Sequence, residues 1–374
     1  MYQTYGNQQT DWLHLAGDTM LNREPNMNLA HKWEYEDGLM LSGVYQIFLK
    51  TGEQKYLDYI KSNIDAYLDD AGHIDGYHFD EFNLDHINNG KILLDLFAET
   101  HDQKYKLAAD QLYQQLLAQP RTPEGTFWHK KIYPNQVWLD GLYMGSVFYG
   151  RYLAQFKPEI GFEDVAHQFI SAYNVTLDAQ SGLCYHAYDA KKIQPWANPE
   201  TGHSPHFWTR SIGWFVMSMV DVLEYIPETD SQRTTILKHL NDLLAALKAV
   251  ADQKTHLWYQ ITDEADRPMN YLESSGSLMI LTAIAKAIRL NYISKDDWRP
   301  FLMTGYDNAL KEFISVTNQN NVNVNKIAHV GGLGGPNKRD GSFAYYMSEP
   351  IVTNDHKGVG PFLLLICEMQ SYLK

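Results

Sequence analysis

The feature that most constrains this chain is a recurring pair of helical segments. In each pair the first segment is apolar nearly all round and contains glycine, whereas the second is amphipathic. Five pairs follow one another: residues 33–50 with 54–68, 84–100 with 104–117, 138–156 with 162–175, 207–225 with 232–251, and 270–290 with 297–316. Two unpaired helical segments, residues 11–21 and 359–372, form a sixth pair if the chain ends meet. Wholly apolar helices are buried, and amphipathic helices cover them.

This pattern predicts an (α/α)6 barrel, a double ring of six inner and six outer helices, in one domain spanning residues 1–374. Strand signals are scarce, and the repeat spacing of about 50–85 residues exceeds that of ordinary helical solenoids. The short links 51–53 and 101–103 place the inner-to-outer turns at one end. The longer stretches before each inner helix gather at the other end, where we expect a site.

Composition and charge exclude several classes of partner. The net charge of −14 argues against nucleic acid, because no basic stripe is present to neutralise phosphates. Two cysteines, Cys184 and Cys367, provide neither a disulfide framework nor a metal-ligand spacing. The first residues, MYQTYGNQQTDW, lack the basic and apolar regions of a secretory signal, and no stretch is long enough to span a bilayer. We expect a cytoplasmic monomer or homodimer with no membrane partner.

One acid stands out inside an apolar and aromatic run. Asp140 lies in VWLDGLYMG, residues 137–145, with glycines one and five positions after it. Isolating a carboxylate in such surroundings costs free energy unless something pairs with it, and it also perturbs the pKa of the acid for proton transfer. A helix cap or a core acid bonded to the backbone is the alternative interpretation.

Polar and aromatic residues recur in the stretches that lead into the inner helices. They are Trp33, Glu34, Tyr35 and Asp37; His78, Asp80, Asp85 and His86; His129, Lys130, Tyr133, Trp138 and Asp140; His206, Trp208, Arg210 and Trp214; Glu273, Ser274 and Ser275; and Asn354, Asp355, His356 and Lys357. In a ring these side chains would all point into one site. Aromatic residues make up 13% of the chain, and such rings stack on sugars as well as filling cores.

Each of these residues also has a structural interpretation. Asp85 and Asp355 suit helix caps, Arg210 suits a core ion pair, and the histidines suit structural hydrogen bonds. A metal site built on Asp80, Asp85 and nearby histidines lacks any recognised ligand spacing, so we expect no metal and no cofactor. The glycine-rich segment 331–336 fits neither a dinucleotide nor a phosphate loop, and a flexible loop lining the site is favoured.

A set of motifs in order carries a family resemblance. They are GTFWHK at 125–130, WLDGLYMG at 138–145, YHAYD at 185–189, PWAN at 195–198, FWTRSIGW at 207–214, LWYQ at 257–260 and LESSGS at 272–277. This set resembles the unsaturated rhamnogalacturonyl hydrolases of glycoside hydrolase family 105, which are related to the unsaturated glucuronyl hydrolases of family 88. The resemblance covers most of the chain. One departure is His256, where the family usually has glycine.

The resemblance implies an (α/α)6 barrel that hydrates the C4=C5 double bond of a terminal unsaturated uronic acid and releases the attached sugar. The expected substrate is unsaturated galacturonyl-rhamnose from pectin, with no cofactor. Asp140 matches the family's general acid/base, and Asp85 matches its partner. The expected substrate contacts are Tyr35, His129, Lys130, Tyr133, Trp138, His186, Trp208, Arg210, Trp214 and Gly332, with Arg210 gripping the sugar carboxylate and Lys130 acting as a point charge.

Other functions remain open on the sequence. An unsaturated glucuronyl hydrolase acting on other lyase products fits the same motifs. The same barrel hosts inverting glycosidases, for which Asp85 and Asp140 would also serve, and sugar epimerases, which use paired histidines. A non-catalytic sugar-binding or scaffold protein is a further alternative. Fold alone does not separate these functions.

Overall fold

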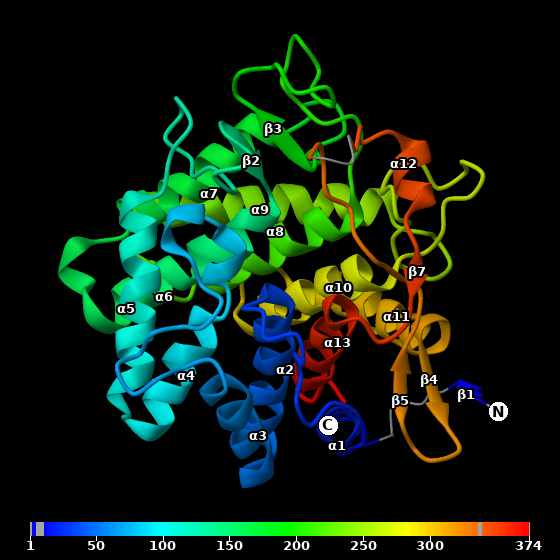
Figure 1. Ribbon diagram of the computed structural model, residues 1–374. Helices are drawn as coiled ribbons and strands as arrows, with labels where there is room; N and C mark the ends of the chain where they lie inside the picture. The colour runs from blue at the N-terminus through cyan, green and yellow to red at the C-terminus, as the bar shows by residue number, and fades with distance from the viewer. Residues whose placement is uncertain (1, 5–10, 336–338, 374) are drawn as a thin grey trace.

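Alternating helices form the two concentric rings that the sequence predicts (Figure 1). The computed structural model describes residues 2–4, 11–335 and 339–373. The inner helices are α2 (Tyr35–Thr51), α4 (Gly90–Thr100), α6 (Val147–Phe156), α8 (Thr209–Val222), α10 (Ser274–Arg289) and α13 (His356–Met369). The outer helices are α1 (Trp12–Arg23), α3 (Gln54–Asp65), α5 (Gln103–Ala118), α7 (Glu163–Thr176), α9 (Ser231–Val250) and α11 (Lys295–Phe313). The fold is therefore an (α/α)6 barrel.

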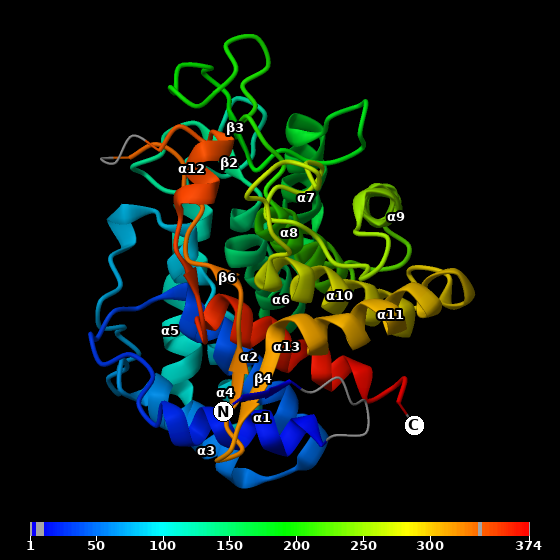
Figure 2. The same cartoon turned by 90° about the vertical axis from the view of Figure 1, so that its right-hand side faces the viewer.

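The two ends of the chain close the ring, as expected. Helix α13 packs against both α2 and α10 in the inner ring, and α1 packs on its outside (Figure 2). The rings of Trp12 on α1 and Phe362 on α13 meet edge to face, with centroids 5.8 Å apart. The sixth helical pair is thus formed by the first and last long helices.

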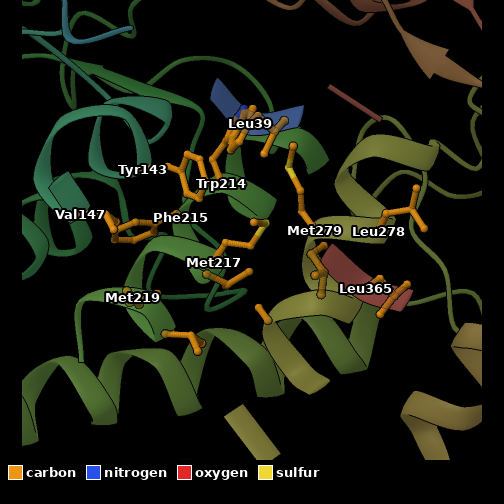
Figure 3. Packing of buried hydrophobic residues seen from close by; sticks show 14 of the residues in the cluster. Leu39, Tyr143, Val147, Trp214, Phe215, Met217, Met219, Leu278, Met279 and Leu365 are labelled. Carbon is orange, nitrogen blue, oxygen red and sulfur yellow. The ribbon is translucent and has the colours of Figure 1, made fainter. Parts of the chain in front are cut away.

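The inner helices surround a common axis. Buried side chains such as Leu39, Trp214 and Met279 come from three different inner helices and belong to one hydrophobic cluster (Figure 3). Nearer the C-terminal ends of these helices, a cavity of about 210 Å³ is lined by all six of them, through residues that include Ser42, Asp95, Arg151, Asp221, Lys286 and Glu368. The carboxylates in this cavity are matched by cations, as in the Lys286–Asp221 pair at 2.6 Å.

Short strands occupy the connections between helices. Strands β1 (Tyr2–Thr4), β4 (Ile314–Thr317) and β5 (Val322–Val324) form one antiparallel sheet in the order β1-β4-β5. Two strand pairs, β2 (Gln136–Trp138) with β3 (Ala187–Asp189) and β6 (Ile327–Ala328) with β7 (Ile351–Val352), are also antiparallel. The short helix α12 (Phe343–Ser348) precedes β7. In both views β2, β3 and α12 lie at one end of the barrel (Figures 1 and 2).

Three predicted helical segments were wrong in extent. Residues 84–100 begin with a 3-10 turn, Leu84–Ile87, before α4 starts at Gly90. Residues 138–156 begin in β2 and pass through a π-helical turn, Leu142–Ser146, before α6. Residues 297–316 end in β4, whose first residue Ile314 pairs with Val324. In each case backbone pairing to a distant segment replaces the local helical pattern. Among the described residues, no helix combines the length and the apolarity needed to cross a membrane.

Glycine allows the first and last inner helices to pack closely. A Cβ atom at Gly360 would lie 2.6 Å from Leu39 Cγ and 3.0 Å from the Leu39 carbonyl oxygen. A Cβ atom at Gly43 would lie 2.6 Å from Leu363 Cβ. Because backbone and Cβ atoms cannot rotate away, any side chain at these positions would push α2 and α13 apart.

We therefore expect Gly360→Ala to lower the free energy of unfolding by about 1–3 kcal/mol, the usual cost of overpacking. Gly150→Ala is the matched control, because its nearest neighbour is a Val222 methyl at 3.2 Å and alanine favours a helix. Chemical denaturation of both variants measures the difference. A Gly360→Ala protein as stable as the parent would contradict the close packing of α2 and α13.

Candidate active site

The pairing of β2 with β3 brings together two residues that are far apart in the sequence. Trp138 pairs with Ala187 across the two strands, and the Leu139 amide donates to the His186 carbonyl at 3.2 Å. Asp140 lies two residues after the end of β2, and His186 immediately precedes β3. As a result, His186 Nε2 lies 3.6 Å from Asp140 Oδ2.

Leu84 and Lys91 contact the π-helical turn, Leu142–Ser146, that follows Asp140. Gly141 and Gly145 face Leu84, where added Cβ atoms would lie within 3.0 Å and 2.9 Å of its methyl groups. The buried Lys91 donates through Nζ to the Tyr143 carbonyl at 3.3 Å and lies 3.3 Å from the centroid of the Tyr143 ring. These contacts fix the backbone that carries Asp140, and π-helical turns often occur at functional sites.

A second carboxylate, Asp85, sits in the 3-10 turn beside this segment. The Leu84 amide donates to the His129 carbonyl at 3.0 Å, which ties the turn to the stretch 129–130. Lys130 Nζ lies 2.5 Å from Asp85 Oδ2, and His129 Nε2 lies 3.3 Å from Asp85 Oδ1. The predicted residues Asp85, His129 and Lys130 therefore form one cluster.

The charges in this cluster are well defined. Burial acts to raise the pKa of Asp85, but the adjacent Lys130 and His129 hold it below its ordinary value. Burial acts to lower the pKa of Lys130, but the Asp85 carboxylate raises it above the ordinary value. Burial lowers the pKa of His129 to about 4. At neutral pH Asp85 and Lys130 are thus a charged pair, and His129 is neutral.

The pKa of Asp140 is shifted in the opposite direction to that of Asp85. Its Oδ2 atom is buried and has no hydrogen-bond partner among the described residues. Burial and the Asp85 charge raise its pKa to about 7, while its own backbone amide, Arg210 and Lys130 act in the other direction. Burial also lowers the pKa of His186 well below its ordinary value, so this neighbour is neutral. Asp140 can therefore carry a proton near neutral pH.

Arg210 lies at the start of α8, deep in the same region. Its Nη1 donates to the Ala328 carbonyl and to Ser275 Oγ (3.3 Å), and its Nη2 donates to the His329 carbonyl at 3.2 Å. Within the described parts of the chain, no carboxylate pairs with Arg210, and the Nε–H and one Nη2–H have no protein acceptor. Its guanidinium lies 4.7 Å from the Trp208 ring, and Trp208 lies 4.6 Å from the His186 ring. Arg210 and Asp140 thus share one neighbourhood.

The predicted aromatic residues fall into two groups. Trp138 stacks with Tyr133 at 4.8 Å and with His129 at 5.0 Å, close to Asp140. Trp214 is 1% exposed and contacts Tyr143 and Tyr35, so its ring is packed inside the barrel rather than presented to solvent.

The glycine-rich segment packs on the same region. A Cβ atom at Gly331 would lie 2.3 Å from the Trp208 ring, and one at Gly332 would lie 2.5 Å from Arg339 Nη1. Glycine lets this segment lie directly against Trp208 and Arg339. Residue 336 of the predicted loop lies outside the described residues.

Several polar residues of the inner-helix starts have structural partners instead. The buried Glu273 caps α10 by accepting from Ser275 N and Gly276 N, and it also accepts from Ala328 N at 3.0 Å. Other ion pairs are Lys357–Glu36 at 2.6 Å, His356–Glu24 at 2.6 Å and His206–Glu264 at 2.6 Å. Among the described residues, no group of three or more His, Cys, Asp or Glu side chains could hold a metal ion.

One contact of the site was missed in the sequence. Tyr346 on α12 places its hydroxyl 2.8 Å from His186 Nδ1, across 160 residues of chain. The stretch 343–346 offers only an aromatic-rich composition as a signal, and no spacing links it to His186.

Comparisons with known proteins establish the family of this chain. The family model described as Glycosyl Hydrolase Family 88 matches residues 12–373 of this chain. A glycoside hydrolase from family 105 of C. acetobutylicum ATCC 824 is 45% identical, with a TM-score of 0.94, over 97% of this chain and 100% of that one. The chain belongs to the glycoside hydrolase family 88 and 105 group. The resemblance read from the motifs is confirmed, and the protein is a glycosidase by family.

Two proteins with lower sequence identity are also similar to this glycosidase, one in sequence and one in fold. The unsaturated rhamnogalacturonyl hydrolase YesR of Bacillus subtilis (strain 168) is 29% identical over 286 residues, which are 74% of this chain and 77% of that protein. The unsaturated glucuronyl hydrolase of Bacillus sp. GL1 shares the fold, with a TM-score of 0.68 and 12% identity over 96% of this chain and 95% of that one.

The raised pKa of Asp140 predicts an unusual effect on stability. The folded glycosidase keeps this proton up to pH about 7, whereas the unfolded chain loses it near pH 4. Folding stability therefore falls as the pH rises through this window, because the folded state binds the extra proton. We expect Asp140→Asn to match the parent near pH 4 and to be more stable at pH 8, by roughly 1–4 kcal/mol.

Asp85→Asn is the matched control. Its carboxylate has a lowered pKa and stabilises the fold above the unfolded pKa of about 4, so its loss should destabilise the protein at pH 7, the opposite direction to that expected for Asp140→Asn. Denaturant titrations of the three proteins from pH 4 to pH 8 measure both effects. An Asp140→Asn difference that is constant across this range would contradict the raised pKa.

Proposed function

We propose that this glycosidase hydrates the C4=C5 double bond of a terminal unsaturated uronic acid and releases the attached sugar. The observation that carries the proposal is a buried carboxyl, Asp140, with a free Oδ2 and a pKa raised to about 7 by burial and by Asp85. Proton donation to carbon at neutral pH requires such a group. The kinship with YesR supports unsaturated galacturonyl-rhamnose as the preferred substrate.

The proposed reaction uses these residues in turn. Asp140 protonates C4 of the enol ether, and the positive charge that develops at C5 is shared with the ring oxygen. The nearby Asp85 carboxylate stabilises this cation electrostatically. Water adds to C5, and the carboxylate of Asp140 accepts a proton from the water, which restores the acid. The resulting hemiketal opens to a ketone at C5, and the anomeric carbon then expels the attached sugar as an alcohol.

Substrate contacts are part of the same proposal. We infer that the Nε–H and the second Nη2–H of Arg210, which have no acceptor among the described residues, donate to the two oxygens of the sugar carboxylate. Lys130, whose side chain is 22% exposed, adds positive charge next to Asp85. The remaining proposed contacts with the sugar are Tyr35, His129, Tyr133, Trp138, His186, Trp208 and Gly332. Trp214 is not among them, because its ring is buried against Tyr143 and Tyr35.

An inverting glycosidase is less consistent with the geometry. Such an enzyme needs a carboxylate base that is free to activate water on the far side of the sugar. Asp85 is held 2.5 Å from Lys130, and its pKa is lowered, which reduces its strength as a base. The stereochemical rule based on carboxylate separation does not apply to hydration of the C4=C5 bond.

Ultraviolet absorbance of the unsaturated uronate tests the proposal directly. We expect absorbance to fall when the protein is added to lyase-generated disaccharides, fastest with those from rhamnogalacturonan and more slowly with those from glycosaminoglycan or ulvan. Asp140→Asn should reduce kcat by at least about 1,000-fold, as expected for an essential proton donor, while the fold is kept. Saturated disaccharides are the control. Cleavage of these without absorbance loss, or near-normal turnover by Asp140→Asn, would contradict the proposal.

The carboxylate contact of Arg210 has its own test. We expect Arg210→Lys to raise KM by roughly 10-fold or more, because lysine cannot form the two parallel hydrogen bonds. The methyl ester of the substrate separates this contact from any packing effect. The parent should prefer the acid over the ester strongly, and Arg210→Lys should show a much smaller preference. An unchanged preference in the variant would exclude Arg210 from carboxylate recognition.

A further inference from the structure

Tyr346 is a buried residue that the reaction above does not use. Its side chain is 0% exposed, and its hydroxyl lies 2.8 Å from Nδ1 of His186. Helix α12 carries Tyr346 over the end of the barrel where β2 and β3 lie (Figures 1 and 2). On the other side of the same imidazole, Nε2 faces Asp140 Oδ2 at 3.6 Å. Tyr346, His186 and Asp140 therefore form a row.

The hydrogen bonds in this row determine where the imidazole proton sits. His186 is neutral, so one ring nitrogen carries hydrogen and the other accepts a hydrogen bond. Among the described residues, His186 Nδ1 is the only acceptor within reach of the Tyr346 hydroxyl. If Nδ1 carried the hydrogen, the buried Tyr346 O–H would have no acceptor, which costs free energy. The satisfied arrangement has Tyr346 donating to Nδ1 and the imidazole hydrogen on Nε2.

We propose that Tyr346 is a positioning residue for proton transfer, which fixes the His186 tautomer whose Nε2–H faces the Asp140 carboxyl. This inference rests on the proposed role of Asp140. At 3.6 Å the Nε2–H makes no hydrogen bond in the resting state. When Asp140 gives its proton to C4 it becomes an anion, and the Nε2–H then donates to it. The interaction is thus stronger in the transition state than before it, which accelerates the chemical step.

Other titratable groups lie around the row. Asp140 faces Asp85, Arg210 and Lys130; His186 faces His129, Arg210 and Arg339; and Tyr346 faces Tyr345 and Asp340. Within this set only the Tyr346 hydroxyl bonds to His186 Nδ1. Removing that hydroxyl therefore changes the tautomer without removing a charge from the site.

The first test is the kinetics of Tyr346→Phe. We expect kcat to fall by roughly 10-fold with KM nearly unchanged, since the lost interaction belongs to the transition state. Activity requires protonated Asp140, so it declines as the pH rises past the pKa of this group. Without the Nε2–H the Asp140 anion is less stable, its pKa rises, and this decline should move to higher pH. Asp85→Asn should move it to lower pH, because it removes the like charge.

Tyr345→Phe is the matched control and should leave both kcat and the pH profile unchanged. A loss of folded protein would lower the apparent kcat of any variant but would not move the pH at which activity declines. If the decline in Tyr346→Phe stays in place or moves to lower pH, the proposed tautomer is wrong.

The second test does not depend on activity or on any substrate. Nitrogen NMR of protein labelled with ¹⁵N-histidine distinguishes the two neutral tautomers, and His186→Gln assigns the signal. We expect the Nε2–H tautomer for His186 in the parent protein. Observation of the Nδ1–H tautomer would overturn the inference even if the hydrolase activity were established. Conversely, the Nε2–H tautomer would support it even if the substrate proposal failed.

Discussion

The site depends on an unequal division of partners between two buried carboxylates. Asp85 has Lys130 at 2.5 Å and His129 at 3.3 Å, whereas Asp140 Oδ2 has no hydrogen bond among the described residues and lies 3.6 Å from the neutral His186. Because two neighbouring acids in a poorly solvated site cannot both ionise easily, the one with the cation becomes the anion and the other keeps the proton. This division supports the proposed roles, with Asp140 as the proton donor and Asp85 as the charge that raises its pKa.

The barrel makes that division possible by holding the parts at one end of the inner ring. Asp85 lies in a 3-10 turn before α4, Asp140 follows β2, and Arg210 lies in the first turn of α8. Close packing between α2 and α13 at Gly360 closes the ring, and the Lys91 contact supports the π-helical turn after Asp140. Burying the Asp140 carboxyl without a hydrogen bond to its Oδ2 lowers the free energy of unfolding, and the packing of the surrounding core offsets this cost.

Much of the fold was predictable, because the alternation of wholly apolar and amphipathic segments is a direct record of inner and outer rings. The convergence of Asp85, Asp140 and Arg210 followed from that topology. What could not be predicted was set by contacts between distant segments and by an irregular helical turn. The β2–β3 strand pair, the π-helical turn and the contact of Tyr346 with His186 have no local sequence signal. The choice of Lys130 as partner for Asp85, and the burial of Trp214, likewise depend on packing that periodicity does not encode.

The central claim is that Asp140 holds a proton near neutral pH, and its own titration tests this most directly. Carboxyl carbons of protein labelled with ¹³C-aspartate can be followed by NMR from pH 4 to pH 9, with Asp140→Asn identifying the signal. The account predicts that the Asp140 signal titrates at a pH of about 7, as burial and the Asp85 charge require. A titration of that signal complete below pH 5 would show that Asp140 is an ordinary anion at neutral pH and would contradict the account.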